Sequence, residues 1–212
     1  MTTLTLYTKP ECPFCWKVRL AFALNQLEYE GILVDTQNKP QSLLDISPKG
    51  TVPVLVTDSE VIDESALIIE FLEARPGGTR LLGDPRSQAL EHYSDKVVGA
   101  KIRDAIFMRR DQPEEQWDQE VLQACQNEWA DILTTLEAQC DPVGPWFLGA
   151  SPSVADCALA ARFALATYYQ LTGLEQHPKL HRWFLRLLHS DTFQTASPDY
   201  LTHTLRDQLK AI

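Results

Sequence analysis

The clearest chemical motif in the chain is a pair of cysteines two residues apart, in the segment Cys12-Pro13-Phe14-Cys15. A strand-like pattern precedes the pair, and apolar residues recur at helical spacing from Pro13 onward, which places Cys12 at the start of a helix. The positive end of a helix dipole and its unpaired backbone N–H groups stabilise a thiolate and lower its pKa. We therefore predict that Cys12 is a catalytic nucleophile and that Cys15, one turn deeper, is a candidate resolving thiol.

Other interpretations of this cysteine pair stay open at the level of the sequence. A lone pair is also consistent with half of a zinc site, but no second such pair or Cys/His cluster accompanies it, so no metal site is expected. Two inert buried thiols are a further interpretation. The chain has 5 cysteines, and an odd, sparse set argues against a disulfide scaffold.

A second motif places a proline at the start of a strand pattern, in residues 49–54. A proline there gives up a hydrogen-bond donor of the sheet, which makes sense if the bond before Pro53 is cis and Val52 offers its backbone to a ligand. An ordinary turn before an edge strand is the competing interpretation. The sequence does not fix the isomer.

A third motif is Asp63-Glu64-Ser65, at the start of a predicted helix. Asp or Ser is a normal N-cap in that position, so a purely structural role is the simpler interpretation. The same geometry also makes an anion site, because the free N–H groups of the helix start bind a carboxylate while Glu64 pairs with an ammonium. An amino-acid headgroup suits both features.

Two regions with different predicted secondary structure position these motifs. Before the breaker cluster at 75–78, strand and helix patterns alternate; strands are expected at 4–7, 29–34, 52–56 and 61–62, and helices from 13 onward and at 41–46 and 64–74. After it, only helical patterns follow, at 87–110, 117–139, 154–171, 178–188 and 200–209. We predict domains at 1–75 and 87–212, joined by a linker at 76–86.

Composition excludes several classes of protein. With 212 residues and 44% hydrophobic residues, the chain buries a real core and is not disordered. Its 19 basic and 29 acidic residues give a net charge of -10, which argues against nucleic-acid binding. The longest mostly apolar stretch, 157–166, is interrupted by Arg162 and is too short to span a bilayer. Since the first residues show no signal-peptide pattern, a cytoplasmic protein with reduced thiols is expected.

The three motifs, in this order and spacing, resemble the glutathione transferase superfamily over essentially the whole chain. Cys12 matches the first-loop residue of that family, Val52-Pro53 its Val-cis-Pro, and Glu64-Ser65 its acidic-Ser pair. Residues 153–156, Ser-Val-Ala-Asp, resemble the buried capping box of its second domain. The resemblance implies an α/β thioredoxin-like N-terminal domain followed by an all-α helical bundle.

A glutathione site is what this resemblance implies, with glutathione as co-substrate. Val52 would bond the cysteinyl backbone of glutathione, while Glu64 and Ser65 would hold its γ-glutamyl end. Lys49 would approach a carboxylate, and Phe14 would pack beside the sulfur or the substrate. The residues expected to bind glutathione are Phe14, Lys49, Val52, Pro53, Glu64 and Ser65.

The residue type at position 12 selects the chemistry within the superfamily. Members with Tyr or Ser there stabilise bound glutathione thiolate, whereas a Cys forms a mixed disulfide with glutathione. The chain thus resembles the Cys-type omega and beta classes, and its Cys-Pro-Phe-Cys motif resembles that of glutaredoxins. We predict a glutathione-dependent thiol transferase or reductase acting on a small electrophilic or disulfide substrate. Tyr7 is expected to be a packed strand residue and not a catalytic tyrosine.

Two other functions remain alternatives. One is a non-catalytic interaction protein with the same fold, like the stringent starvation proteins that resemble this family; the other is conventional conjugation of glutathione to electrophiles. The resemblance also implies a homodimer, formed through the N-terminal domain helix of one subunit and the first bundle helices of the other. No nucleic-acid or membrane partner is expected.

The pocket for the second substrate gives the weakest signal. By family resemblance it lies between the domains, and its candidate residues are Tyr93, Met108, Arg109, Phe163 and Tyr168. At helical spacing such side chains are more often simply core or surface residues. For the compact basic run 108–110, a solvated helix end is the preferred interpretation.

Overall fold

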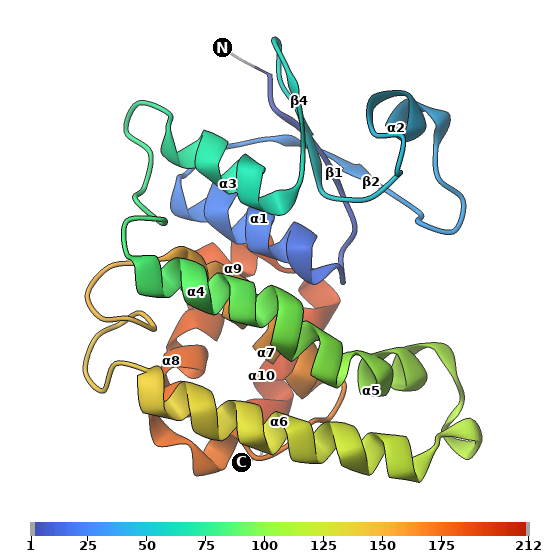
Figure 1. Ribbon diagram of the computed structural model, residues 1–212, viewed down its shortest axis with the longest axis vertical. Coiled ribbons are helices and arrows are strands. Elements are labelled where there is room, and N and C mark those ends of the chain that lie inside the picture. The colour runs from blue at the N-terminus through green and yellow to red at the C-terminus, as the bar shows by residue number, and fades with distance from the viewer. Residues whose placement is uncertain (1–2, 211–212) are drawn as a thin grey trace.

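The computed structural model describes residues 3–210 of the chain and divides into a sheet-containing part and a helical part (Figure 1). Residues 1–2 of the first predicted domain and residues 211–212 of the second lie outside the described residues. The N-terminal elements are β1 (Thr5–Thr8), α1 (Pro13–Leu24), β2 (Glu30–Leu33), α2 (Gln41–Ile46), β3 (Val54–Val56), β4 (Val61–Asp63) and α3 (Ser65–Glu73).

The four strands form one mixed sheet in the order β2-β1-β3-β4. β1 runs parallel to β2 and antiparallel to β3, and β4 pairs antiparallel with β3 as the predicted hairpin partner. β3 is thus an interior strand, which excludes the interpretation of 49–54 as a turn before an edge strand. The bond between Val52 and Pro53 is cis.

Alternation along β1 explains how helices cover both faces of the sheet. Leu6 packs in the large core with α1 and α3, whereas Tyr7 packs on the other face with Leu43 of α2 and with Val54. Tyr7 is therefore a buried strand residue, as predicted. α1 and α3 lie side by side between the sheet and the helical part (Figure 1).

The second part contains only helices among the described residues. They are α4 (Pro85–Tyr93), a π-helical turn (Ser94–Val98), α5 (Gly99–Asp111), a short 3-10 turn (Glu114–Gln116), α6 (Gln119–Gln139), α7 (Val154–Tyr168), a second 3-10 turn (Leu174–Gln176), α8 (Pro178–Leu188), α9 (Asp191–Ala196) and α10 (Asp199–Lys210). The predicted fold class, a thioredoxin-like domain followed by a helical bundle, is confirmed.

Three details of the helical part differ from the prediction. The helix expected at 87–110 contains a π-helical turn between α4 and α5, where the backbone takes one extra residue per turn. The helix expected at 154–171 ends at Tyr168, because Gln170 takes a left-handed conformation, with φ 61°, and reverses the chain. The short helix α9, begun by Ser190, was not expected from the sequence.

Helix α7 is the central element of the core and is buried over most of its length. Its start is fixed by the Asp156 carboxylate, which accepts hydrogen bonds from the backbone N–H groups of Ser153 and Phe147 and from the Trp183 indole, at 2.7 to 2.9 Å. This matches the predicted structural motif. The cysteines outside the pair, Cys125, Cys140 and Cys157, are buried packing residues.

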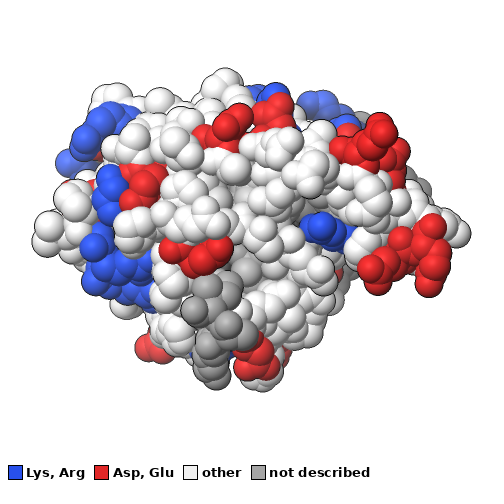
Figure 2. Space-filling view, turned by 90° about the horizontal axis from the view of Figure 1, so that it is seen from below, with Lys and Arg blue, Asp and Glu red and all other residues white. Residues whose placement is uncertain are grey.

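Charge is distributed unevenly over the surface of the helical part. Figure 2 views the molecule from its helical end and shows acidic side chains gathered on the side of the α5–α6 connection, with basic side chains at the opposite edge. None of the helices in residues 3–210 has the length and apolar character needed to cross a membrane.

Candidate active site

Cys12 immediately precedes α1, where its extended backbone turns the chain into the helix at Pro13. Its Sγ atom lies 3.8 Å from the Val52 carbonyl oxygen, a contact that the protonated thiol makes as a donor. Cys12 is partly exposed, whereas Cys15 is fully buried and accepts a hydrogen bond from the Lys9 backbone N–H at 3.4 Å. The accessible sulfur is therefore that of Cys12.

The pKa values of the two thiols are shifted in opposite directions. A hydrogen bond from the Cys15 thiol lowers the pKa of Cys12 to about 6 and outweighs the opposing effect of burial; the backbone N–H groups of Cys15 and Phe14, and the charge of Arg19, act in the same direction. Burial, and then the neighbouring Cys12, raise the pKa of Cys15 far above its usual value. Near neutral pH the pair consists of a Cys12 thiolate and a protonated Cys15.

Arg19 of α1 braces the loop that carries Cys12. Its buried guanidinium donates to the Thr8 hydroxyl at 2.9 Å and to two backbone carbonyls of that loop, at 3.1 and 2.8 Å. It also donates to the Ala196 carbonyl of α9 at 2.7 Å. One side chain thus ties the thiol loop to the helical part, and its role was not expected from the sequence.

A cleft of about 580 Å³ lies beside the cis peptide bond, and we call it the cis-proline cleft. All six residues expected to bind glutathione line it: Phe14, Lys49, Val52, Pro53, Glu64 and Ser65. α4 closes its other side. The three motifs that lie apart in the sequence therefore meet in one site.

Glu64 and Ser65 present the start of α3 to this cleft. Glu64 has a φ of 123°, a backbone conformation that is costly for a residue with a side chain and is found mostly where function requires it. Its carboxylate lies 3.8 Å from the Lys49 ammonium, and both side chains are exposed, so this ion pair contributes little stability and is available to a ligand.

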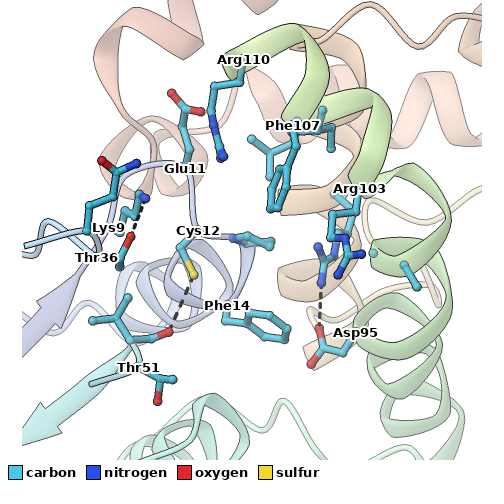
Figure 3. Close-up of a pocket in the computed structure, with 18 of the residues that line it drawn as sticks. Lys9, Glu11, Cys12, Phe14, Thr36, Thr51, Asp95, Arg103, Phe107 and Arg110 are labelled. Carbon is cyan, nitrogen blue, oxygen red and sulfur yellow. Dashed lines mark hydrogen bonds and ion pairs between the residues drawn. The ribbon is translucent and has the colours of Figure 1, made fainter. Parts of the chain in front are cut away.

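A second cleft, of about 660 Å³, contains Cys12 and is called here the thiol cleft. It shares Phe14, Thr51, Val52 and Asp95 with the cis-proline cleft, so the two adjoin. Figure 3 shows Arg103, Phe107 and Arg110 of α5 across the opening from Cys12.

The lining of the thiol cleft is basic although the whole chain has a net charge of -10. Its charged residues are Lys9, Lys39, Arg103, Arg110 and Arg162 against Glu11 and Asp95, a formal charge of +3. Low-dielectric walls lined by one sign of charge focus the electric field. The lining of the thiol cleft therefore favours an anionic ligand.

Glu11, next to Cys12, is held by two tyrosines from distant parts of the chain. Its carboxylate accepts hydrogen bonds from the hydroxyls of Tyr169, at 2.5 Å, and Tyr200, at 2.7 Å. Burial, together with this carboxylate, raises the pKa of both tyrosines. The tyrosines fix one wall of the thiol cleft and stay protonated.

The residues predicted for the second-substrate pocket do not reach either cleft. Phe163 is fully buried between the rings of Trp129 and Trp183 in the core. Tyr168 packs against the rings of its neighbour Tyr169 and of Tyr200. Both are structural residues of α7.

The other three candidates face away from the clefts. Tyr93 turns toward Thr135 of α6, and Met108 accepts a hydrogen bond from the Asp118 backbone N–H at 3.1 Å. Arg109 donates to the Tyr169 carbonyl and lies over the Trp117 ring. The α5 residues that do line the thiol cleft recur at helical spacing one face away: Gly99, Arg103, Ile106, Phe107 and Arg110.

The fold and the site together define a class of protein: a thioredoxin-like domain with a stabilised thiolate at a helix start, joined to a helical domain that completes the clefts. Within the described residues, no three His, Cys, Asp or Glu side chains are placed to hold a metal ion.

Comparison with known proteins agrees with this class. Residues 6–80 match the glutathione S-transferase N-terminal domain family, and residues 119–186 match the glutathione S-transferase C-terminal domain family. The chain is 31% identical over 158 residues to the probable glutathione S-transferase DHAR1, cytosolic, of Oryza sativa subsp. japonica, covering 73% of this chain and 67% of that protein. The chain therefore belongs to the glutathione S-transferase family.

Two further comparisons set the extent of the similarity. The chain is 30% identical over 154 residues to the chloroplastic glutathione S-transferase DHAR3 of Arabidopsis thaliana; the match covers 72% of this chain but spans only 54% of that relative's length. A glutathione S-transferase structure from Rhodospirillum rubrum F11 superposes with a TM-score of 0.81 at 22% identity, covering 95% of this chain and 99% of that one. At that identity the superposition shows the shared fold.

Proposed function

We propose that the protein is a glutathione-dependent thiol transferase that works through a mixed disulfide between Cys12 and glutathione. The observation that carries the proposal is the stabilised thiolate of Cys12 in the thiol cleft, which adjoins the cis-proline cleft through Phe14, Thr51, Val52 and Asp95. Family membership supports glutathione as the co-substrate. The cysteine at this position favours exchange at sulfur over activation of bound glutathione.

The cis-proline cleft offers groups that suit each part of glutathione. Val52, which lines the cleft next to Pro53, offers its backbone to the cysteinyl residue of the peptide. The start of α3 at Ser65 suits the γ-glutamyl carboxylate, and the Glu64 carboxylate suits its ammonium. Lys49, exposed beside Glu64, suits a second carboxylate.

The reaction is an exchange of two sulfur–sulfur bonds. The Cys12 thiolate attacks the glutathione sulfur of a mixed disulfide G–S–S–R; a new bond forms to Cys12, the old bond breaks, and R–S⁻ leaves with the electron pair and takes a proton from water. Glutathione thiolate then attacks the glutathione sulfur held on Cys12. Oxidised glutathione leaves, the Cys12 thiolate is restored, and glutathione has supplied the two electrons.

The test is glutathione-dependent turnover of a mixed disulfide of glutathione with 2-mercaptoethanol. Cys12→Ser should lower kcat by at least about a hundredfold, because a hydroxyl at this position forms no disulfide. The matched control, Cys15→Ser, should stay within roughly tenfold of the parent, since the route above needs one thiol and a serine hydroxyl still donates a hydrogen bond to Cys12.

Retained turnover in the Cys12→Ser protein would refute the nucleophile. Loss of activity in Cys15→Ser alone would replace the one-thiol route with a dithiol one. Turnover of a halogenated aromatic acceptor in place of disulfides would favour conjugation, and an absence of both activities together with no binding of glutathione would favour an interaction protein.

A further inference from the structure

Arg162 of α7 is a buried cation in the wall of the thiol cleft. Its side chain is 9% exposed, and its Nε atom is buried without a hydrogen-bond partner. Within residues 3–210, its polar contact is an ion pair at 4.0 Å with Asp95. Asp95 is more closely engaged by Lys17, at 2.6 Å.

A guanidinium in this state is costly. Burying a charge without hydrogen bonds is unfavourable, and proteins normally surround a buried arginine with acceptors. Arg19 shows the usual outcome in the same protein, because its guanidinium reaches four oxygen atoms at 2.7 to 3.1 Å. An arginine left short of acceptors on a cleft wall indicates that the missing acceptor belongs to a ligand.

The surrounding residues make room for the Arg162 guanidinium at this place. A Cβ atom at Gly99 would lie only 2.6 Å from the guanidinium carbon, so a glycine there leaves the space that the charged group occupies. The Phe14 ring lies 5.2 Å from the guanidinium on another side. Packing therefore holds the Arg162 guanidinium beside Phe14 and Asp95, which line both clefts.

The shape and charge of the thiol cleft define the ligand. A planar guanidinium fork matches a carboxylate, which it binds through two parallel hydrogen bonds. The exposed rings of Phe14 and Phe107 offer apolar surface to a flat group in the same cleft. A volume of about 660 Å³ holds a ligand of this size.

We propose that Arg162 binds the carboxylate of the second substrate, which is an aromatic carboxylate bearing the sulfur that Cys12 releases. That the second substrate carries a sulfur rests on the proposed thiol transfer. That Arg162 binds a carboxylate does not depend on it. A carboxylate of glutathione has the same chemistry, but Arg162 lines the thiol cleft and is absent from the lining of the cis-proline cleft.

Equilibrium binding separates these two sources. The probes are 4-(methylthio)benzoate, its neutral methyl ester and S-methylglutathione, titrated calorimetrically into Cys12→Ser protein so that no exchange takes place. Adding Arg162→Met should weaken binding of the benzoate roughly tenfold or more and remove its advantage over the ester, as expected for loss of charge-assisted hydrogen bonds. S-methylglutathione should bind as before. The matched control is Arg86→Met, which removes an exposed arginine outside both clefts.

Two further variants and a measurement of Tm distinguish a loss of ligand binding from a loss of folding. Gly99→Ala should also weaken benzoate binding, because the new methyl group displaces the guanidinium, and Arg162→Lys should bind the benzoate more weakly than the parent but more tightly than Arg162→Met. Thermal unfolding of Arg162→Met should give an unchanged or higher Tm, since removing a poorly paired buried charge is not destabilising.

Unchanged benzoate affinity in Arg162→Met, or a loss confined to S-methylglutathione, would overturn the proposal. A lower Tm with unchanged benzoate affinity would make Arg162 a structural residue. Failure of the thiol-transfer assay, by contrast, would refute the proposed reaction and leave the measured carboxylate site standing, so the two failures are distinguishable.

Discussion

At the level of single residues, the site depends on the different pKa values of two neighbouring thiols, Cys12 and Cys15. Cys15 contributes a proton that it does not lose, because burial raises its pKa, and Cys12 gains the charge. A hydrogen bond to the charged form stabilises that form, so the buried thiol makes its neighbour nucleophilic without being consumed. The same pair is then poised to form a disulfide if Cys12 is oxidised.

This difference in pKa predicts the pH dependence of alkylation. The rate of Cys12 alkylation by iodoacetamide should rise with pH, with a midpoint at about 6 and a plateau near neutral pH, whereas the midpoint for an ordinary thiol is about 8.5. Cys15→Ala removes the hydrogen-bond donor and should move the midpoint upward, toward the ordinary value. Cys15→Ser keeps a donor and should move it less. A midpoint in Cys15→Ala equal to that of the parent would contradict this origin of the acidity.

At the scale of elements, the thiol loop is held by α1 through Arg19. Arg19→Met would leave four oxygen acceptors without their donor and should lower the free energy of unfolding by about 3 kcal/mol in urea titrations. Arg86→Met removes one partner of an exposed ion pair and should leave the free energy of unfolding nearly unchanged. Equal effects of the two variants would show that Arg19 does not brace the loop.

The elements also explain which parts of the site were predictable from the sequence. Cys12, Val52 and Ser65 each lie where a strand or helix begins, so local signals located the cis-proline cleft. The thiol cleft depends on which face of α5 meets the loop, and Arg109 lies on a different face of α5 from the cleft-lining Arg110. Helical spacing shows which residues share a face of a helix, but it does not show which part of the protein that face contacts.

Hydrogen-bond partners that lie far apart along the chain could not be predicted from the sequence either. The two tyrosines that hold Glu11 lie 158 and 189 residues away along the chain. Arg162 was seen only as a charge interrupting an apolar stretch, because nothing local indicates that a guanidinium in a buried helix faces a cleft. The fold class and the place of Cys12 at a helix start could be predicted from the sequence, whereas the lining of the thiol cleft required the three-dimensional structure.

At the scale of the whole molecule, a buried ion pair joins the two parts. Lys17 of α1 lies 2.7 Å from Glu91 of α4 and 2.6 Å from Asp95 of the π-helical turn, and its side chain is 1% exposed. Lys17→Met should destabilise the protein by about 3 kcal/mol, because the largely buried Glu91 carboxylate loses its partner and Asp95 keeps only its longer pair with Arg162. Lys101→Met removes the exposed pair with Glu128 and should have a much smaller effect on the free energy of unfolding. Urea unfolding of both variants gives the comparison, and a difference near zero would mean that this contact does not hold the parts together.

Thiol transfer through Cys12 requires that glutathione become covalently attached to this residue, and intact-protein mass spectrometry detects that attachment. Cys15→Ser protein, which lacks the resolving thiol, is treated with oxidised glutathione, and the modified residue is located by peptide mapping. We predict one glutathionyl group per chain, on Cys12, and none on the Cys12→Ser protein, because the remaining cysteines are buried. Attachment at another cysteine, or equal modification of Cys12→Ser, would contradict the account.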